Sequence, residues 1–464
     1  MSRRRDGQVM INKQKQTTPY FDNGVVCLYQ ADARSIPLDD QSVHCVVTSP
    51  PYFGLRVYAG NDNRGIGVET SVDAYVANMV DVFREVKRVL RDDGVCWLNL
   101  GDSYTGGGRG DSSTPKQSTN IGSNQLQPMV DIGLDAGNRI GIPEQVVMEL
   151  QGDGWIWRDT VIWAKKSTMP ESLNGWRWEQ CRVKVESAAR NVGEIHPSGN
   201  RTMPMNGPIG TAEQARWRDC SGCPKCAGND GLVLRKGSWR NTSSHEYIYM
   251  LTKGMGYFAD GEAVKTLAAE SSIKRVKSGL KTDKDTPGKG HVNVDVMGDR
   301  FLPGGKANRR SVWSDISPEP YGGAHFATFP SDLPRICIQA STSEKGVCSE
   351  CGNQWARVVE KTDPVTRKVD SVYSQDANDS AQGNFSNERW DEPGETQTIG
   401  WRPTCKCNAP VVPATVLDPF AGTFTTGYAA QKLGRLAVGT DISETYLNQA
   451  IKRLMAVPLP MREI

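Results

Sequence analysis

The sequence predicts an α/β fold built on a sheet of parallel strands, and three features indicate it. Short apolar runs end abruptly at turn residues, which is typical of strands buried on both faces. A stretch of helical periodicity lies between two of these runs, in the order of a βαβ unit. Glycine and proline contribute 47 and 26 of the 464 residues, a loop-rich composition that argues against a helical bundle. A chain of this length also exceeds one simple domain.

The elements of the N-terminal part follow from apolar periodicity. Strands are expected at residues 25–29, 42–47, 95–100 and 157–163, and helices at 72–91 and 143–150. Residues 103–130 are rich in glycine and small polar side chains, so they are expected to form a long loop.

The strand at 42–47 ends at the turn Ser49-Pro50-Pro51-Tyr52. Because proline donates no backbone hydrogen bond, this turn leaves carbonyl oxygens exposed at the carboxyl end of the strand. Open α/β sheets bind their ligands at that edge. A carbonyl, a serine hydroxyl and an aromatic ring together suit an amino group on a flat ring, with the oxygens accepting hydrogen bonds and the tyrosine stacking on the ring.

A second unit of strand, turn, helix and strand is expected near the C-terminus. Its first strand ends at Asp418, and a glycine-containing turn leads to Thr425 and Thr426, whose hydroxyls are expected to cap a helix at 427–433. The next strand, at 436–440, is followed by Asp441. An acidic residue at this position is placed to accept hydrogen bonds from ribose hydroxyls.

Charge and hydropathy limit the class of protein. Lys plus Arg total 55 and Asp plus Glu total 53, a net charge of +2. Residues 274–310 nevertheless hold ten basic and four acidic residues, a surplus that suits either a nucleic-acid contact or a solvated loop. No run approaches the roughly 18 consecutive apolar residues of a membrane span, and the first residues lack the apolar core of a secretory signal. A cytoplasmic protein with no membrane association is therefore expected.

Eight of the twelve cysteines lie in two groups. The groups are Cys181, Cys220, Cys223 and Cys226, and Cys348, Cys351, Cys405 and Cys407. Close thiol pairs on tight turns present thiolates to one tetrahedral metal, so each group predicts a structural zinc site; the alternative is a set of unliganded thiols. Disulfides are disfavoured by the expected compartment. The other four, Cys27, Cys45, Cys96 and Cys337, stand alone in apolar stretches and are expected in the core.

These motifs resemble those of the DNA amino-methyltransferases that use S-adenosylmethionine. Residues 48–52 are similar to the family's catalytic Ser/Asp/Asn-Pro-Pro-Tyr, and residues 418–426 to its Asp-Pro-Phe-x-Gly cofactor loop. Residues 325–330 are similar to the segment that precedes that loop, and residues 29–32 to the strand whose aspartate faces the cofactor adenine. Residues 97–104, 162–165 and 245–248 resemble the intervening strands.

The resemblance implies a Rossmann-like methyltransferase sheet in circularly permuted order. Together with the cysteine groups, it predicts a loop-rich insertion that contains zinc. The implied catalytic residues are Ser49, Pro50, Pro51 and Tyr52. The implied cofactor-binding residues are Asp32, Phe329, Asp418, Pro419, Phe420, Gly422, Thr425, Thr426 and Asp441. The implied cofactor is S-adenosylmethionine, and the implied partner is double-stranded DNA. A cognate restriction enzyme is compatible with the resemblance, and the oligomeric state is left open.

The resemblance also implies a mechanism. The target base is flipped out of the duplex and stacks on Tyr52, while Ser49 and the Pro50 carbonyl accept hydrogen bonds from its exocyclic amine. The amine nitrogen then attacks the sulfonium methyl in line. In this family a serine at the first catalytic position accompanies cytosine N4 most often, and an aspartate accompanies adenine N6. Cytosine N4 is therefore favoured, with adenine N6 as the alternative.

The expected domain boundaries follow the motifs. The catalytic half is assigned to residues 20–166, a target-recognition region to 167–310, a return to the main domain to 311–345, a zinc-ribbon-like insertion to 346–410, and the cofactor-binding half to 411–464. Trp176, Arg177, Trp178, Trp217, Trp239 and Arg240 lie in the second range. Such residues suit contacts with DNA, and the tryptophans suit a core equally well.

One residue departs from the family's pattern. Phe424 stands where the cofactor loop usually has its second glycine, and a bulky side chain adopts positive φ only at a cost. The departure admits an inactive, zinc-containing DNA-binding protein as an alternative. Methyltransferases of similar fold that act on RNA or on protein are the other alternative.

Overall fold

The computed structural model describes two compact units of the chain. The described residues are 18–54, 65–105, 133–166, 168, 171, 173–184, 217–268, 306–317, 319, 329–361, 365–368, 388–392 and 396–456. The main unit comprises the residues up to Lys166 and those from His245 onward, and the small unit lies within residues 167–244.

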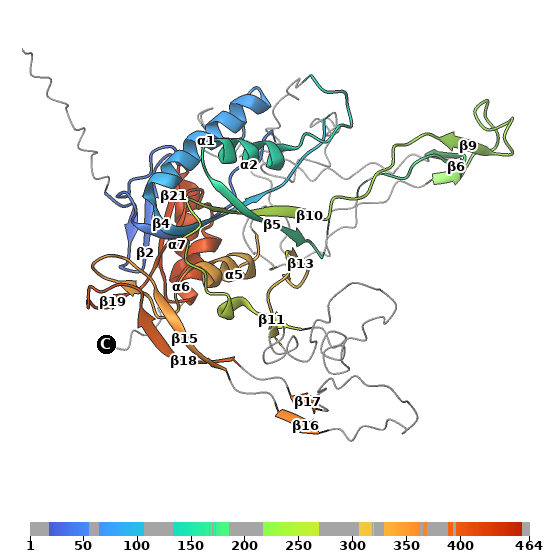
Figure 1. The fold of residues 1–464 in the computed structure, drawn as a ribbon. Helices are drawn as coiled ribbons and strands as arrows, with labels where there is room; N and C mark the ends of the chain where they lie inside the picture. Colours follow the sequence, from blue (N-terminus) through green and yellow to red (C-terminus); the bar gives the residue numbers. More distant parts are fainter. Residues whose placement is uncertain are drawn as a thin grey trace, which may run out of the picture. The chain divides into compact units, whose positions relative to one another are not determined.

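A nine-stranded sheet forms the centre of the main unit, in the order β1-β2-β21-β20-β3-β4-β10-β5-β13 (Figure 1). Its strands are β1 (Phe21–Asp22), β2 (Val26–Gln30), β3 (Val43–Thr48), β4 (Leu90–Leu100), β5 (Ile156–Ala164), β10 (His245–Thr252), β13 (Val312–Trp313), β20 (Thr415–Asp418) and β21 (Leu436–Asp441). The five strands from β2 to β4 are mutually parallel. β10 runs antiparallel to both of its neighbours, so the sheet is mixed rather than wholly parallel.

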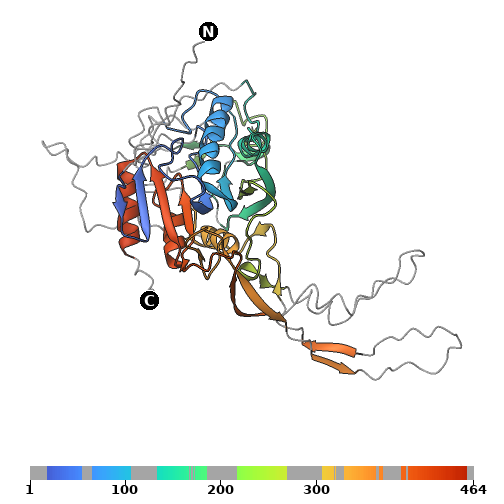
Figure 2. The same cartoon turned by 60° about the vertical axis from the view of Figure 1, so that its left-hand side comes forward.

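Helices cover both faces of the sheet, as the βαβ pattern predicts (Figure 2). They are α1 (Val72–Val89), α2 (Ile142–Gly152), α5 (Asp332–Ser341), α6 (Thr425–Lys432) and α7 (Glu444–Met455). α1 and α2 share one buried cluster with the sheet, and α5, α6 and α7 share the other. α1 begins where Ser71 Oγ accepts a hydrogen bond from the Ala74 amide at 3.1 Å, and it ends because Leu90 is already extended.

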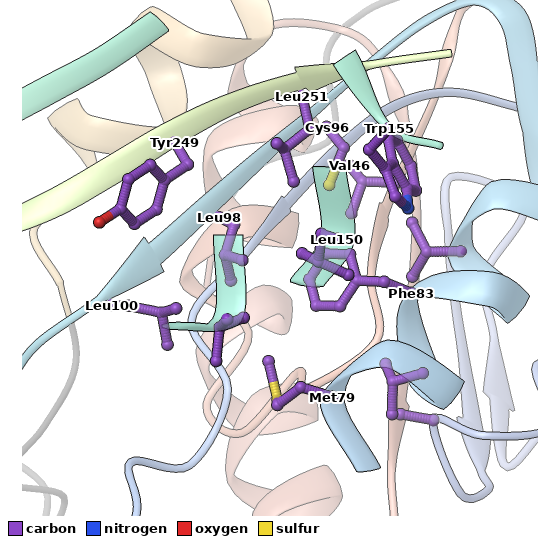
Figure 3. Close-up of a cluster of buried hydrophobic side chains, with 14 of the residues drawn as sticks. Val46, Met79, Phe83, Cys96, Leu98, Leu100, Leu150, Trp155, Tyr249 and Leu251 are labelled. Atoms are coloured by element: carbon purple, nitrogen blue, oxygen red, sulfur yellow. The ribbon is translucent and has the colours of Figure 1, made fainter. Parts of the chain in front are cut away.

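The alternation of side chains along β4 divides the core between these two clusters. Cys96, Leu98 and Leu100 face α1 and α2 (Figure 3). Val95 and Trp97 point to the opposite side, toward the cluster of α5, α6 and α7. A strand buried on both faces is the reason that this segment reads as a continuous apolar run.

Phe424 is part of this core rather than of the loop surface. It precedes α6 in the left-handed conformation, with φ 55°, and no side chain caps the helix; the prediction of a threonine cap is therefore wrong, because Thr425 and Thr426 already lie in its first turn. The ring is fully buried. A Cβ added at Gly427 would lie 2.3 Å from this ring, and one added at Gly439 would lie 3.0 Å from it. The two glycines thus create the space that the ring fills.

The second cysteine group is tied to the amino ends of the central strands. β14 (Val347–Cys348) pairs with β19 (Val411–Val412). The Arg91 guanidinium donates to the Cys351 carbonyl at 3.0 Å. His44, on β3, accepts from the Thr415 amide at 3.1 Å through Nδ1 and lies 3.0 Å from the Gly352 carbonyl through Nε2. Burial lowers the pKa of His44 to about 4, so the neutral ring accepts at Nδ1 and donates at Nε2.

Short two-stranded ribbons make up the remaining elements of the main unit. They are β11 (Thr266–Leu267) with β12 (Lys306–Ala307), β15 (Trp355–Lys361) with β18 (Thr396–Pro403), and β16 (Val365–Lys368) with β17 (Glu388–Glu392); a 3-10 helix spans Glu262–Val264. Most of the expected loop at 103–130 and of the basic segment at 274–310 lies outside the described residues. Among the described residues, no helix has the length and apolar composition to cross a bilayer.

The small unit consists of two ribbons and has almost no hydrophobic core. β6 (Arg177–Gln180) pairs with β9 (Leu232–Arg235), and β7 (Arg182–Lys184) pairs with β8 (Trp217–Asp219). Of the unit's residues whose burial is described, Cys181 and Cys226 alone are buried. Four tryptophans are exposed, namely Trp176, Trp178, Trp217 and Trp239. The interpretation of these tryptophans as a core is therefore wrong.

The space around Phe424 yields a stability prediction. Gly427→Ala places a Cβ against a fully buried ring, so we expect the free energy of unfolding to fall by about 2 kcal/mol or more, despite the better helix propensity of alanine. Gly152→Ala, at the end of α2, is the matched control because its Cβ would meet nothing within 4 Å. Urea unfolding followed by circular dichroism measures both variants; equal stability of the two would contradict this account.

Candidate active site

The two principal motifs meet at one edge of the sheet, although the chain separates them widely. β20, which ends at Asp418, pairs with β3, which ends at Thr48, and with β21, which ends at Asp441. All three strands are parallel, so their carboxyl ends lie at the same edge. The turn Ser49–Tyr52 and the loop after Asp418 therefore emerge from neighbouring strands.

The Asp418 carboxyl group joins these elements. Its Oδ1 accepts hydrogen bonds from the Thr48 hydroxyl at 2.7 Å and from the Phe420 amide at 3.1 Å. Its Oδ2 lies 2.9 Å from the Thr426 hydroxyl, which is also 2.9 Å from the Val47 carbonyl. The Thr426 hydroxyl has a single proton, so it donates to Asp418 Oδ2 or to the Val47 carbonyl while Asp418 is ionised. When Asp418 is protonated, its Oδ2 can donate to Thr426, which leaves the Thr426 proton for Val47. The geometry therefore accommodates both forms of the carboxyl group.

Burial favours the neutral form of Asp418, whereas the hydrogen bonds that it accepts favour the ionised form. Asp418 is 2% exposed, and burial raises its pKa from 3.8 to about 6, against the opposing effect of its hydrogen bonds with Thr48 and Thr426. Burial also raises the pKa of Asp441, although the Ser443 and Gly422 amides favour its ionised form. Asp418 thus connects β20, β3 and α6 within the interior.

Two residues of β21 hold the loop that follows Asp418 through hydrogen bonds. Asp441 Oδ2 accepts from the Gly422 amide at 2.8 Å, and the Thr440 hydroxyl donates to the Pro419 carbonyl at 2.8 Å. Gly422 has φ 52°, a conformation that favours glycine. A Cβ at Gly422 would meet only the Phe420 carbonyl, at 3.9 Å, so space beside the loop is open. An open turn beside a carboxylate suits a nucleoside ligand.

The Ser49–Tyr52 turn is fixed at several points. The Tyr75 hydroxyl donates to the Pro51 carbonyl at 3.0 Å, which occupies one lone pair of that oxygen. The Pro50 carbonyl has no hydrogen-bond partner among the described residues. A Cβ at Gly101 would lie 2.7 Å from the Tyr52 ring, so the absence of a side chain there makes room for the ring.

Three residues that sequence reasoning did not select complete this site. Asn99 Nδ2 donates toward Ser49 Oγ at 3.3 Å and toward the Tyr52 hydroxyl oxygen at 3.1 Å. The Tyr52 hydroxyl donates to Glu246 Oε2 at 2.9 Å, and Glu246 forms an ion pair with Lys165. Burial and the Glu246 carboxylate raise the pKa of Tyr52 well above 10, so its hydroxyl remains protonated.

The Asn99 side chain also has a hydrogen-bond acceptor, Oδ1, that receives no hydrogen bond from the described residues. The residue is 3% exposed, and its Oδ1 is buried without a hydrogen-bond partner in the described part of the chain. Asn99 and Glu246 lie on β4 and β10, and Lys165 directly follows β5, so only the order of the strands brings them together. The one signal in the sequence was the resemblance of these segments to the family's intervening strands.

Asp32 and Phe329 lie at the periphery of these contacts. The Asp32 carboxylate forms a forked ion pair with Arg34, with its Oδ2 2.7 Å from Nη2. Phe329 packs against the cluster that contains α5, α6 and α7. The preceding part of its motif, residues 325–328, lies outside the described residues. Thr425, expected to touch the cofactor, accepts a hydrogen bond from Arg453 at 2.7 Å.

Each cysteine group gathers four sulfur atoms within 4.8 Å of one another. In the first group, Cys223 Sγ lies 3.8 Å from that of Cys181 and 3.7 Å from that of Cys226. Four sulfurs at about 2.3 Å from one zinc ion would be about 3.8 Å apart. Backbone amides lower the pKa of Cys223 and of Cys348 to about 7, the Lys225 amide in the first case and the Cys351 amide in the second. Both groups can therefore hold a tetrahedral metal.

The pKa of Asp418 yields a prediction for stability against pH. A folded pKa above the ordinary value stabilises the protein while the group is protonated, and this stabilisation is lost as pH rises through 6. Asp418→Asn keeps the neutral arrangement at every pH, because its amide can donate to Thr426. Relative to the natural chain, we expect the variant to gain about 2 kcal/mol between pH 4.5 and 7.5.

Urea unfolding of both proteins at the two pH values measures this gain, and Asp39→Asn, on the surface, serves as the control. A difference between the natural chain and Asp418→Asn that does not change with pH would mean that Asp418 is ionised throughout.

Comparison with known proteins agrees with this arrangement. The chain matches the DNA methylase family model N6_N4_Mtase over residues 43–349 and 413–452. It is 31% identical to the Type II methyltransferase M.Cfr9I of Citrobacter freundii over 98% of this chain and 95% of that protein. It is 29% identical to M.SmaI of Serratia marcescens over 90% of this chain and 86% of that one.

Among solved structures, the cytosine-N4-specific PvuII DNA methyltransferase matches 94% of this chain and 88% of its own, at 12% identity and a TM-score of 0.41. The family match and the relatives confirm the resemblance that the two motifs carry. The chain belongs to the N6/N4 DNA methylases, a family of S-adenosylmethionine-dependent amino-methyltransferases.

Proposed function

We propose that the protein transfers a methyl group from S-adenosylmethionine to the N4 atom of a cytosine flipped out of duplex DNA. The observation that carries this proposal is the hydrogen bond between Thr48 and Asp418, at 2.7 Å. It holds the turn that would receive the base beside the loop that would receive the cofactor. Methyl transfer requires the base and the cofactor to lie next to each other, and this hydrogen bond keeps their two binding segments together.

We assign three acceptors to the amine of the target base. They are the Ser49 hydroxyl oxygen, the Pro50 carbonyl and the unpartnered Oδ1 of Asn99. Hydrogen bonds from the amine to these oxygens raise the electron density on its nitrogen and orient the nitrogen lone pair. After transfer the methylated nitrogen carries one proton too many; the neutral oxygens accept it as a hydrogen bond, and the proton then passes to water. Asn99 is the addition that the geometry makes to the family's motif.

Tyr52 would stack on the flipped base. Its hydroxyl is tied to Glu246, which Lys165 holds in turn, so the ring has a fixed orientation before a base arrives. Preorganised rings cost less conformational entropy on binding than mobile ones. We therefore assign Glu246 and Lys165 to positioning of Tyr52 rather than to contact with the base.

On the cofactor side, Asp441 would accept hydrogen bonds from the ribose, and the open turn at Gly422 would leave room for the ligand. Bound S-adenosylmethionine would supply an electrophilic methyl group. We keep Asp32 as a proposed adenine contact and Phe329 as a proposed cofactor contact, although Arg34 must share the Asp32 carboxylate. Asp418, Thr425 and Thr426 would act through the shape of the loop, because their polar atoms already contact Thr48, Arg453 and Val47.

The choice of cytosine rests on Ser49. A neutral hydroxyl at the first catalytic position accompanies cytosine N4 most often in the family that the chain resembles. Adenine N6 is the alternative outcome, since its amine presents the same chemistry. Phe424 was the reason to consider an inactive DNA-binding protein. Because its ring is buried in the core instead of lying over the cofactor loop, this residue no longer supports that alternative.

For the organisation of the protein we keep the permuted order, with the catalytic strand before the cofactor strands, and the five expected domains. Within residues 167–310, the strand β10 belongs to the main sheet, so we assign target recognition to the rest of that range. We place the enzyme in the cytoplasm, where bacterial DNA is found. A cognate restriction enzyme remains a candidate partner.

We also propose that both cysteine groups bind structural zinc. Sulfur separations of 3.7 and 3.8 Å and amide hydrogen bonds to the sulfurs support this for the first group. In the small unit, the metal would replace a hydrophobic core, since Cys181 and Cys226 are its only residues described as buried. In the main unit, the contacts of Arg91 and His44 with the turn at 351–352 would attach the second site to β3 and β4.

The function is tested by nucleoside mass spectrometry of DNA from cells that express the chain. New N4-methylcytosine is expected, and it should disappear with Ser49→Ala and fall at least about ten-fold with Asn99→Ala, which remove acceptors of the amine. Ser42→Ala is the matched control, because Ser42 lies just before the opposite end of β3 and bonds only Asp39.

Each variant is first shown to bind S-adenosylmethionine by calorimetry, so that loss of modification reports on the base pocket. New N6-methyladenine would support the same methyl transfer but would show that the target base is adenine rather than cytosine. No modified base with intact cofactor binding would overturn the proposal of a DNA substrate.

The metal sites are tested by elemental analysis of protein purified without chelator. Two zinc ions per chain are expected, one for each cysteine group. Cys223→Ser should reduce this to one, and Cys27→Ala, outside both groups, should leave it unchanged. Absence of zinc in the natural chain, or an equal loss in the two variants, would refute the assignment.

A further inference from the structure

The small unit exposes a face on which two tryptophans lie side by side. Trp176 and Trp178 are 69% and 52% exposed. Trp178 lies on β6, and Trp176 lies at the bend just before it. The Gly237 amide donates to the Gly175 carbonyl at 3.1 Å, so the two segments stay paired beyond β6 and β9, and alternation along this pairing places both tryptophans on the same face of the ribbon. Trp178 lies opposite Leu234, and the Lys236 ammonium group lies 4.8 Å from the centre of the Trp176 ring. We call these four residues the tryptophan face.

Nothing within the described small unit covers this face. In most small domains, rings of this size supply the core, and their burial is a large share of the stability. In this unit the only residues described as buried are cysteines of the first group. Large apolar side chains that are left exposed in this way are typical of an interaction surface.

The charge around the face indicates the kind of partner. Among the described residues of the unit, eight are Lys or Arg and four are Asp or Glu. On the opposite face of the same ribbon, Arg177 and Arg235 are both paired with Glu179, at 2.5 and 3.4 Å. Lys236 has a tryptophan ring as its neighbour, so its charge is available to an anion beside the aromatic rings.

We propose that the tryptophan face binds the DNA substrate, with the indole rings against bases or sugars and Lys236 at a phosphate. Aromatic rings beside a cation suit nucleic acid, because the rings can pack against sugars or against a base that is unstacked, and every nucleotide carries a negative charge. This inference rests on the proposed function, which makes DNA the substrate, and it adds a contact surface separate from the catalytic turn.

Fluorescence anisotropy of a fluorescein-labelled duplex of mixed sequence, titrated at fixed salt, tests the proposal. The double variant Trp176→Ala with Trp178→Ala is expected to weaken binding at least about ten-fold, and the double phenylalanine variant should recover most of it. Trp217→Ala is the matched control, because it removes an exposed tryptophan of the same unit from the other ribbon. Zinc content and affinity for S-adenosylmethionine should stay unchanged in all variants.

The outcomes separate this inference from the proposed function. If the natural chain does not bind the duplex, the DNA substrate itself is wrong. If the natural chain binds and the alanine double variant binds equally well, or if Trp217→Ala weakens binding by the same factor, the assignment to this face is wrong. A change from dimer to monomer in sedimentation, with unchanged DNA affinity, would assign the face to a second copy of the chain instead.

Discussion

The buried hydrogen bonds of Asp418 are the constraint on which the site depends. They join the last residue of β20 to the last residue of β3 and to the first turn of α6. These elements carry the two motifs, and they lie at opposite ends of the sequence. Because the carboxyl group is enclosed, any displacement of one element leaves polar atoms of the others without partners, at a cost of about 1–3 kcal/mol for each group. The positions of β20, β3 and α6 relative to one another are therefore fixed before either ligand binds.

The two units use different physical means to remain folded. The main unit buries side chains on both faces of a nine-stranded sheet, and hydrogen bonds in its candidate site join the turn after β3 to β4 and β10. The small unit encloses little beyond sulfur atoms, so in our proposal its stability comes from metal coordination. This division leaves the apolar residues of the small unit free for intermolecular contacts, whereas those of the main unit are committed to its interior.

Much of this architecture could be predicted from the sequence. Apolar periodicity located α1 and most of the central strands, because strands buried on both faces and an amphipathic helix have distinct patterns. It could not predict the direction of β10, because the apolar pattern of a buried strand is the same whether the strand is parallel or antiparallel to its neighbours. The sequence did not predict that Asn99, Glu246 and Lys165 belong to the site, because their proximity depends on the order of the strands. The tryptophans were ambiguous because composition does not reveal whether a metal or an apolar cluster supplies the interior.

Phe424 has a consequence for how this family varies. Its ring occupies the space left by Gly427, where an added Cβ would lie 2.3 Å from the ring, so the two positions form one steric unit. In a chain with glycine at position 424 that space is empty, and a larger residue at position 427 becomes acceptable or even favourable. Gly439 is constrained separately, because a Cβ there would also lie 2.9 Å from the Ala421 and Leu28 side chains. Substitution at 424 or 427 alone leaves either a void or an overlap. Across related chains, these two positions are thus expected to change together, as a correlated pair that preserves volume rather than residue identity.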